Sequence, residues 1–218
     1  MKYSINKTAD LSGIRLHYAD ELNGAGLEFR LDFIDVVTQK GWQVDRVYEM
    51  CSGPAFIGFS LLAKGLCKSL CLADINPKAV EACRRTIADN GLEDRVSVYL
   101  SDGLTDIPAH EQWDLVVGSP PFFSQSGSRD DRIKKAIKFS GSDLLWLDPD
   151  WQMHKDFYHN VGQHLRPGAP ILMLESRWGK GEEDFKSFIK EGNLEFVETL
   201  PCRRQNPRLY YIHARQPG

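Results

Sequence analysis

From about residue 46 onward, short apolar runs alternate with longer amphipathic stretches, and this alternation constrains the fold more than any other feature of the sequence. The runs predict strands at Arg46–Met50, Ser69–Ala73, Val96–Leu100, Leu115–Val117 and Ile171–Leu174. The other stretches predict helices at Ile57–Lys64, Lys78–Asn90, Trp151–Leu165 and Glu182–Glu191. Strands that alternate with helices form a parallel sheet with helices on both faces.

The end of the chain departs from this alternation. Glu195–Leu200 and Leu209–Ala214 predict two strands, and only the sequence PCRRQNPR separates them. That link is too short for a crossover connection, so we predict an antiparallel pair. The predicted class is therefore α/β, with a mostly parallel sheet that closes on antiparallel strands.

The composition excludes several other classes of protein. The chain has 218 residues, of which 42% are hydrophobic and 26% charged, and this is typical of one globular domain. No apolar run approaches the roughly 18 residues that cross a membrane, so no membrane partner is expected. Five cysteines, an odd number, indicate reduced thiols and a cytoplasmic location. The net charge of −3 does not by itself indicate nucleic-acid binding.

Three acidic residues lie at the ends of the first three predicted strands: Glu49, Asp74 and Asp102. Because the carboxyl ends of parallel strands meet at one edge, we expect these residues close together, where open α/β sheets bind ligands. The turn after the first strand is built from small residues and Gly53, which let a ligand approach the backbone. A carboxylate at Asp74 suits the two hydroxyls of a ribose.

These residues, together with the sequence DLVVGSPPF at 114–122, resemble the class I S-adenosylmethionine-dependent methyltransferases. They are most similar to the HemK-like group, with its (Asn/Asp/Ser)-Pro-Pro-(Tyr/Phe) motif. The resemblance covers about residues 45–215 and implies S-adenosylmethionine as the cofactor. It also implies a Rossmann-like fold with a seven-stranded sheet of order 3-2-1-4-5-7-6, the last strand antiparallel. A dehydrogenase is a poorer match, because Cys51 and Phe56 replace two glycines of its G-x-G-x-x-G fingerprint.

The resemblance implies which residues hold the cofactor. Glu49 would face the amino group of the methionine moiety, Asp74 the ribose and Asp102 the adenine amino group. The full predicted cofactor set is Glu49, Cys51, Gly53, Asp74, Ile75, Ser101, Asp102, Gly103 and Ser119. The usual Gly-x-Gly-x-Gly turn reads CSGPA at 51–55, which retains only the middle glycine and implies a more restricted backbone.

The predicted catalytic motif is Ser119-Pro120-Pro121-Phe122. A planar NH2 group carries two donors, and Ser119 Oγ and the Pro120 carbonyl can accept one each. The prolines hold that carbonyl in place, and Phe122 offers a ring on which a flat substrate stacks. Because the methyl group already sits on a sulfonium leaving group, alignment is needed rather than a strong base. This favours nitrogen methylation; the alternative is a Pro-Pro loop with Phe122 and Phe123 packed in the core.

We divide the chain into an N-terminal segment, 1–45, that covers the cofactor or substrate, and a methyltransferase domain, 46–218. Within the first, Tyr18, Phe29 and Phe33 pack either on the cofactor or in the core. Residues 124–149 form an insert on the substrate side of the domain.

Two net-positive segments, 129–138 and 203–215, border the predicted substrate mouth. The predicted substrate contacts are Phe123, Arg129, Arg132, Arg203 and Arg204, with Lys134 and Lys135 on the same rim. This rim would suit an anionic substrate, and scattered solvated charge is an equally good interpretation.

The sequence shows no cluster with metal-ligand spacing, so no metal is expected. His154, His159 and His164 recur every five residues and therefore point in different directions on a helix. We expect surface or capping histidines at these positions.

Three functions remain open at this point. The first is an S-adenosylmethionine-dependent enzyme that methylates a planar nitrogen, such as a side-chain amide, of a protein or peptide. The second methylates an exocyclic amine of adenine or cytosine in RNA or DNA. The third is a non-catalytic module that binds S-adenosylmethionine.

Overall fold

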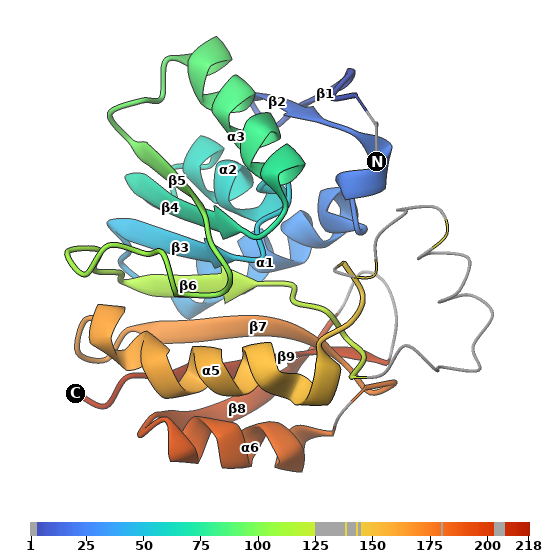
Figure 1. The fold of residues 1–218 in the computed structure, drawn as a ribbon. Coiled ribbons are helices and arrows are strands. Elements are labelled where there is room, and N and C mark those ends of the chain that lie inside the picture. The colour runs from blue at the N-terminus through green and yellow to red at the C-terminus, as the bar shows by residue number, and fades with distance from the viewer. Residues whose placement is uncertain (1–3, 125–137, 139–142, 144, 180, 203–207) are drawn as a thin grey trace.

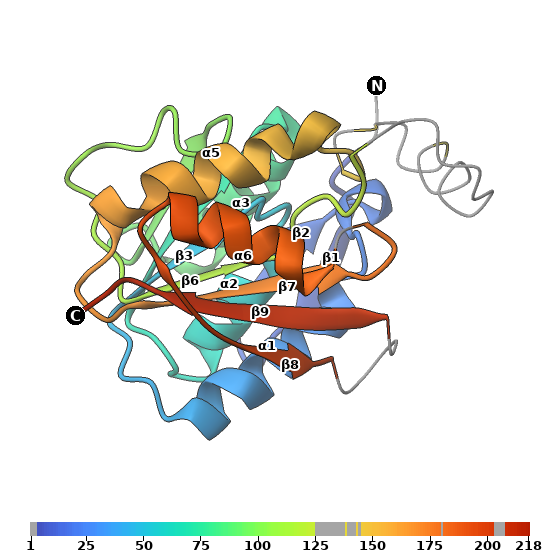
Figure 2. The same cartoon turned by 90° about the horizontal axis from the view of Figure 1, so that it is seen from below.

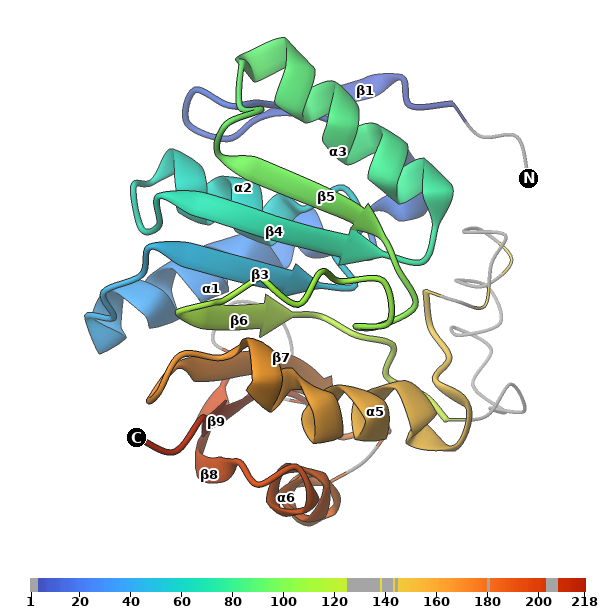
Figure 3. The same cartoon turned by 60° about the vertical axis from the view of Figure 1, so that its left-hand side comes forward.

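Figure 1 shows the computed structural model of the chain, which describes residues 4–124, 138, 143, 145–179, 181–202 and 208–218. Its central sheet has the strands β3 (Arg46–Met50), β4 (Ser69–Asp74), β5 (Val96–Leu100), β6 (Leu115–Gly118), β7 (Pro170–Ser176), β8 (Glu195–Pro201) and β9 (Leu209–Arg215). Across the sheet their order is β5-β4-β3-β6-β7-β9-β8 (Figure 3). Counted along the chain from β3, this order is 3-2-1-4-5-7-6, so the predicted topology is confirmed.

The pairing of the strands is parallel from β5 to β7, and β9 runs antiparallel to both β7 and β8. All seven predicted strands are present, and their ends differ from the predicted ones by at most two residues. The carboxyl ends of β3, β4, β5 and β6 therefore lie at one edge of the sheet, and this edge positions the site described below.

Each face of the sheet has its own hydrophobic core. The α-helices within the described residues are α1 (Gly26–Lys40), α2 (Phe56–Ala63), α3 (Pro77–Asn90), α5 (Gln152–Asn160) and α6 (Glu182–Glu191). Helices α1 and α2 lie on one side of the sheet and α5 and α6 on the other (Figure 2). Because successive side chains of a strand point to opposite faces, Val47 packs with α1 and α2, whereas Tyr48 packs with α5 and α6.

The predicted helix over 151–165 is shorter in the structure. Helix α5 spans Gln152–Asn160, and 3₁₀ turns at Pro149–Trp151 and Val161–His164 flank it. The helix begins at Gln152 because Asp150 and Trp151 have φ values of 54° and 59°, in the left-handed region that interrupts a right-handed helix.

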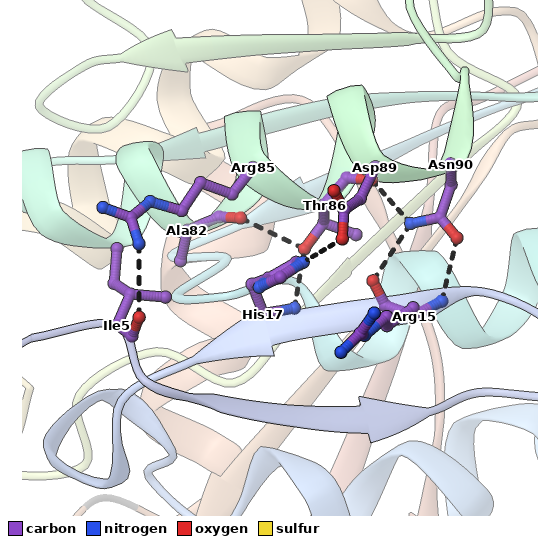
Figure 4. A network of polar contacts seen from close by, with 8 residues as sticks. All are labelled: Ile5, Arg15, His17, Ala82, Arg85, Thr86, Asp89 and Asn90. Carbon is purple, nitrogen blue, oxygen red and sulfur yellow. Dashed lines mark hydrogen bonds and ion pairs between the residues drawn. The ribbon is translucent and has the colours of Figure 1, made fainter.

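The N-terminal segment forms elements that the sequence pattern did not reveal. Strands β1 (Lys7–Asp10) and β2 (Arg15–Tyr18) make a hairpin, and each is only four residues long, which is too short for a clear alternation. Figure 4 shows this hairpin attached to α3 by hydrogen bonds between Arg15 and Asn90, between His17 and both Thr86 and Asp89, and from Arg85 to the Ile5 carbonyl.

Among the residues that the structure describes, no helix is long and apolar enough to cross a membrane.

Candidate functional site

A cavity of about 400 Å³ opens at the carboxyl edge of the sheet, a size typical of small-molecule sites. Its sheet side is lined by Met50, Cys51, Gly53, Ala73, Asp74, Ile75, Ser101, Asp102, Gly103, Ser119 and Pro121. Across from the sheet, Leu147, Asp148, Gln152, Met153 and Asp156 contribute. A smaller cavity of about 50 Å³ shares Cys51, Gly53 and Ser119 with it and adds Glu49, Pro120 and Phe122.

The loop after β3 keeps the left-handed positions of a glycine-rich turn, although Gly53 is the only glycine left at 51–55. Cys51, Gly53 and Ala55 have φ values of 50°, 51° and 64°, so all three adopt the left-handed conformation. The amide of Ser52 donates to the Ala73 carbonyl at 3.0 Å, which holds the loop against β4. Cys51 and Ala55 therefore replace the flanking glycines of the usual turn and still adopt its left-handed conformation.

Asp74, at the end of β4, braces the same loop. Its Oδ2 accepts a hydrogen bond from the Gly53 amide at 2.7 Å, and its Oδ1 accepts one from the Asn76 amide at 2.8 Å. Burial raises the pKa of Asp74, and these two amides oppose that rise. Each carboxylate oxygen can accept a second bond, so Asp74 can also bind a hydroxyl in the cavity.

Other predicted cofactor residues reach the cavity in different ways. Ile75 exposes 43% of its surface and offers an apolar contact. Ser101 is buried, where its Oγ donates to the Gly103 carbonyl and accepts from the Asp106 amide, so it shapes the loop around Asp102. Asp102 and Gly103 line the cavity directly.

Glu49 is held differently from the other acids. It is 2% exposed, and its Oε2 accepts a hydrogen bond from the Gly58 amide in the first turn of α2 at 2.7 Å. A Cβ at Gly58 would lie 2.6 Å from that oxygen, so any larger residue there would displace the Glu49 carboxylate. Burial raises the pKa of Glu49 to about 8, against the lowering effect of the amides of Gly58 and Ile57.

The predicted catalytic motif follows β6 directly. Ser119 lines both cavities, Pro121 lines the larger one, and Pro120 and Phe122 line the smaller one. Phe123, predicted as a substrate contact, is buried and not among the residues that line either cavity. The structure thus brings the motif and the acidic strand ends to one place.

The N-terminal segment reaches the cavity through Glu21 and Leu22. Tyr18, Phe29 and Phe33 instead belong to the core: Tyr18 meets Phe56 edge to face, and Phe29 and Phe33 are buried. Of the two interpretations of these aromatic residues, the structure favours core packing.

The expectation of surface or capping histidines is wrong for His154, which is 0% exposed and lies between two carboxylates. Its Nδ1 is 2.6 Å from Asp148 Oδ2 and its Nε2 is 3.1 Å from Glu175 Oε1. His164 is buried too, with Nδ1 2.9 Å from the Glu111 carbonyl oxygen, whereas His159 is exposed. Burial alone lowers the pKa of His154, but Glu175 and Asp148 outweigh it and raise the pKa to about 9.

The remaining predicted substrate contacts lie outside the described residues. These are Arg129, Arg132, Lys134, Lys135, Arg203 and Arg204.

A mostly parallel sheet of this order, closed by an antiparallel strand and with acidic residues at its carboxyl edge, defines the class I methyltransferase fold. The family model of the methyltransferase small domain matches residues 33–145. The chain therefore belongs to the methyltransferase small domain family, whose cofactor is S-adenosylmethionine. The residues fit that group: the cavity combines an open left-handed turn at Gly53, a carboxylate at Asp74 and an exposed apolar side chain at Ile75.

Among curated proteins, the release factor glutamine methyltransferase of Neisseria gonorrhoeae is 24% identical over 168 residues, covering 72% of this chain and 56% of the relative. The ribosomal protein uL3 glutamine methyltransferase of Bradyrhizobium diazoefficiens is 22% identical over 160 residues, covering 72% and 47%. The ribosomal RNA small subunit methyltransferase C of Actinobacillus pleuropneumoniae is 36% identical over 77 residues, covering 35% and 22%. The chain thus spans about half the length of these relatives, or less.

The fold is also shared with solved structures. The T. thermophilus 16S rRNA N2 G1207 methyltransferase, in complex with AdoMet and guanosine, superposes with a TM-score of 0.63 at 14% identity and covers 96% of this chain and 50% of its own. The hMettl16 catalytic domain, in complex with an RNA hairpin, has a TM-score of 0.66 at 15% identity and covers 86% and 69%.

Proposed function

We propose that this protein transfers a methyl group from S-adenosylmethionine to a planar nitrogen, such as a side-chain amide, of a protein or peptide substrate. The single observation that carries the proposal is the position of Ser119-Pro120-Pro121-Phe122, which lines the cavities formed by the acidic strand ends.

When bound, the cofactor would supply a methyl carbon on sulfur. The nitrogen lone pair would bond to that carbon while the carbon–sulfur bond breaks and leaves its electron pair on sulfur, and the proton lost by the nitrogen would pass to solvent. Ser119 Oγ and the Pro120 carbonyl accept the two N–H bonds of the planar nitrogen and orient its lone pair. Asp74 binds the ribose hydroxyls, Asp102 the adenine amino group, and Glu49 the amino group of the methionine moiety. The protein contributes alignment and exclusion of water rather than a base.

The length of the similarity supports a protein substrate. The matches to the two glutamine methyltransferases extend over 72% of the chain, whereas the match to the ribosomal RNA enzyme extends over 35%. The five free cysteines support a cytoplasmic location for the reaction.

A second candidate is methylation of an exocyclic amine of adenine or cytosine in RNA or DNA. Two structural neighbours were solved with a guanosine or an RNA hairpin, and the half-buried Phe122 offers a ring for stacking on a base. Phosphate contacts would make binding fall steeply with added salt.

One experiment separates these candidates. The protein is incubated with tritium-labelled S-adenosylmethionine and fractionated cell extract, and the labelled fractions are treated with protease or nuclease. Label released by protease supports the protein substrate, and label released by nuclease supports the nucleic acid. Binding of S-adenosylmethionine without label in any fraction supports the non-catalytic module.

Ser119→Ala tests the catalytic motif. It removes one of the two acceptors that orient the nitrogen, so we expect kcat to fall by about ten-fold to a hundred-fold, because a lost positioning contact has that size. The affinity for S-adenosylmethionine, measured by calorimetry, should change little. Asp74→Ala is the matched control, with the opposite pattern of weaker cofactor binding. If Ser119→Ala keeps the wild-type kcat, the assignment of this motif is wrong.

A further inference from the structure

A chain of contacts joins the sheet to the exit of the catalytic loop. Glu175 extends from β7, and its Oε1 lies 3.1 Å from Nε2 of His154 on α5. The Nδ1 of His154 lies 2.6 Å from Asp148 Oδ2. The backbone amide of Asp148 donates to the carbonyl of Phe123 at 2.7 Å. Because Phe123 follows Phe122 directly, the Asp148–His154–Glu175 triad reaches the end of the catalytic motif.

Asp148 also fixes the first turn of α5. Its Oδ1 accepts a hydrogen bond from the Met153 amide at 2.9 Å, and its Oδ2 accepts one from the His154 amide at 3.1 Å. These amides belong to the turn that carries Gln152 and Met153 into the cavity wall. The Asp148 side chain therefore binds the start of α5 and the imidazole, and the Asp148 backbone amide binds the loop exit.

The loop exit is held on its other side as well. A Cβ at Gly179 would lie 2.0 Å from the Phe122 carbonyl oxygen, so the backbone after β7 passes directly against the motif. The amide of Phe123 donates to the Trp146 carbonyl at 3.2 Å. The end of the motif is therefore enclosed between the segment before α5 and the segment after β7.

The backbone between Asp148 and α5 is strained. Asp150 and Trp151 are consecutive residues in the left-handed conformation, and neither is glycine. Such strain persists only where surrounding contacts over-determine the conformation, and it concentrates at functional sites. Trp151 packs edge to face on His154 and on Phe185 of α6, so the strained turn is in direct contact with the histidine of the triad.

The charge of the triad is set by its two carboxylates. Tyr158 of α5 and Tyr210 of β9 pack nearby, as does Cys51 of the loop after β3, and burial raises the pKa of all three, which keeps them neutral. Arg177 lies over the ring of Tyr210, 4.7 Å from its centre. His154 thus carries its proton at neutral pH, with a pKa of about 9, and donates to both Asp148 and Glu175.

We propose that Asp148, His154 and Glu175 are positioning residues for methyl transfer, because their ionic triad fixes the exit of the Ser119–Phe122 loop at the cavity. This inference rests on the proposed function. It assigns a role to two buried residues behind the cavity wall, His154 and Glu175, and to Asp148, which lines the cavity and acts here through the loop exit that it holds.

Two variants test the triad, and one serves as control. His154→Gln removes the cation and one of its two hydrogen bonds. Glu175→Gln supplies an amide that can donate to a neutral imidazole, so the triad no longer requires a protonated ring. His159→Gln changes an exposed histidine of the same helix. Each is compared with the wild type for kcat, for S-adenosylmethionine affinity and for the dependence of kcat on pH between 7 and 10.

We expect His154→Gln to lower kcat by about ten-fold to a hundred-fold, the effect of a misplaced catalytic group, with S-adenosylmethionine affinity within about two-fold of the wild type. The wild-type kcat should fall as pH rises through about 9, and Glu175→Gln should lose this fall. Because a role in folding alone would lower activity only by lowering the folded fraction, that fraction is measured by circular dichroism at each pH, and the positioning role requires kcat to fall while the protein stays folded. An unchanged kcat in His154→Gln, or the same fall above pH 9 in Glu175→Gln, overturns the proposal.

Amide hydrogen exchange gives a readout that needs no acceptor. In His154→Gln, exchange at the amides of Phe123 and Asp148 should become faster, and in His159→Gln it should not. Equal exchange in both variants overturns the positioning role even if the wild type labels no fraction. A wild type without transferase activity, but with this exchange pattern, refutes the proposed function alone.

Discussion

The cavity has two walls that hold their carboxylates in opposite ways. At the sheet edge, Glu49 and Asp74 accept hydrogen bonds from neutral backbone amides, those of Gly58 and Gly53 among them. On the other side, Asp148 lines the cavity, and it and the buried Glu175 of β7 flank a protonated imidazole. The sheet edge is therefore shaped by backbone conformation, and the far wall by ions.

This difference determines how each wall responds to pH. Glu49 has a folded pKa of about 8, above its usual 4.5, so folding retains a proton that the unfolded chain loses. The contribution of the Glu49 carboxyl to the free energy of unfolding is therefore greatest below about pH 4.5 and is lost as pH rises to about 8. His154, with a folded pKa of about 9 against 6.5, contributes stability that is complete below about 6.5 and lost as pH rises through 9.

The largest expected effect is on the far wall. His154→Leu leaves the carboxylates of Asp148 and Glu175 facing each other without a cation, and breaking such a buried pair costs about 3–5 kcal/mol. We expect that loss in the free energy of unfolding by urea at pH 7. The difference from the wild type should narrow at pH 10, where the wild-type imidazole is neutral. His159→Leu is the control, and an equal difference at both pH values would contradict the ionic description of this wall.

A smaller effect of opposite sign is expected at the sheet edge. Glu49→Gln keeps an oxygen for the Gly58 amide and removes a carboxyl that resists ionisation. The variant should match the wild type near pH 4.5 and exceed its unfolding free energy by up to about 4 kcal/mol at pH 8, since one pKa unit is worth about 1.4 kcal/mol and the pKa of Glu49 rises from 4.5 to about 8.

Glu111→Gln is the contrast to Glu49→Gln. Glu111 is as buried as Glu49, but both of its oxygens bind the Arg46 guanidinium at 2.7 Å. Burial raises its pKa, and the pair with Arg46 outweighs burial and holds the pKa below its usual value. Glu111→Gln should therefore destabilise at pH 8. If both variants changed the unfolding free energy at pH 8 in the same direction, the type of hydrogen-bond partner would not determine the pKa shift of these carboxylates.

The sequence predicted the sheet edge far better than the far wall. Glu49, Asp74 and Ser119 each end or follow a strand, so a local pattern places them without knowledge of packing. His154 gave no such signal, because its partners Asp148 and Glu175 stand on separate elements that only the tertiary fold brings together. The short hairpin at residues 7–18 was missed because β2 packs against α3 and β1 pairs with β2, so neither strand depends on its own alternation.

The smallest effect concerns the backbone shape of the sheet edge. Gly53 has a φ of 51°, and a Cβ there would meet the Leu22 carbonyl at 3.4 Å, an ordinary contact distance. Gly53→Ala should therefore lower the free energy of unfolding by about 1–2 kcal/mol, the cost of a left-handed alanine. The lower entropy of the unfolded alanine chain offsets about 0.4–1 kcal/mol of this loss. Gly91→Ala, with a φ of 60° and no atom near its added Cβ, should lose the same amount. A larger loss of unfolding free energy at Gly53 than at Gly91 would show that Leu22 presses on the turn, and that the N-terminal segment helps to shape this wall.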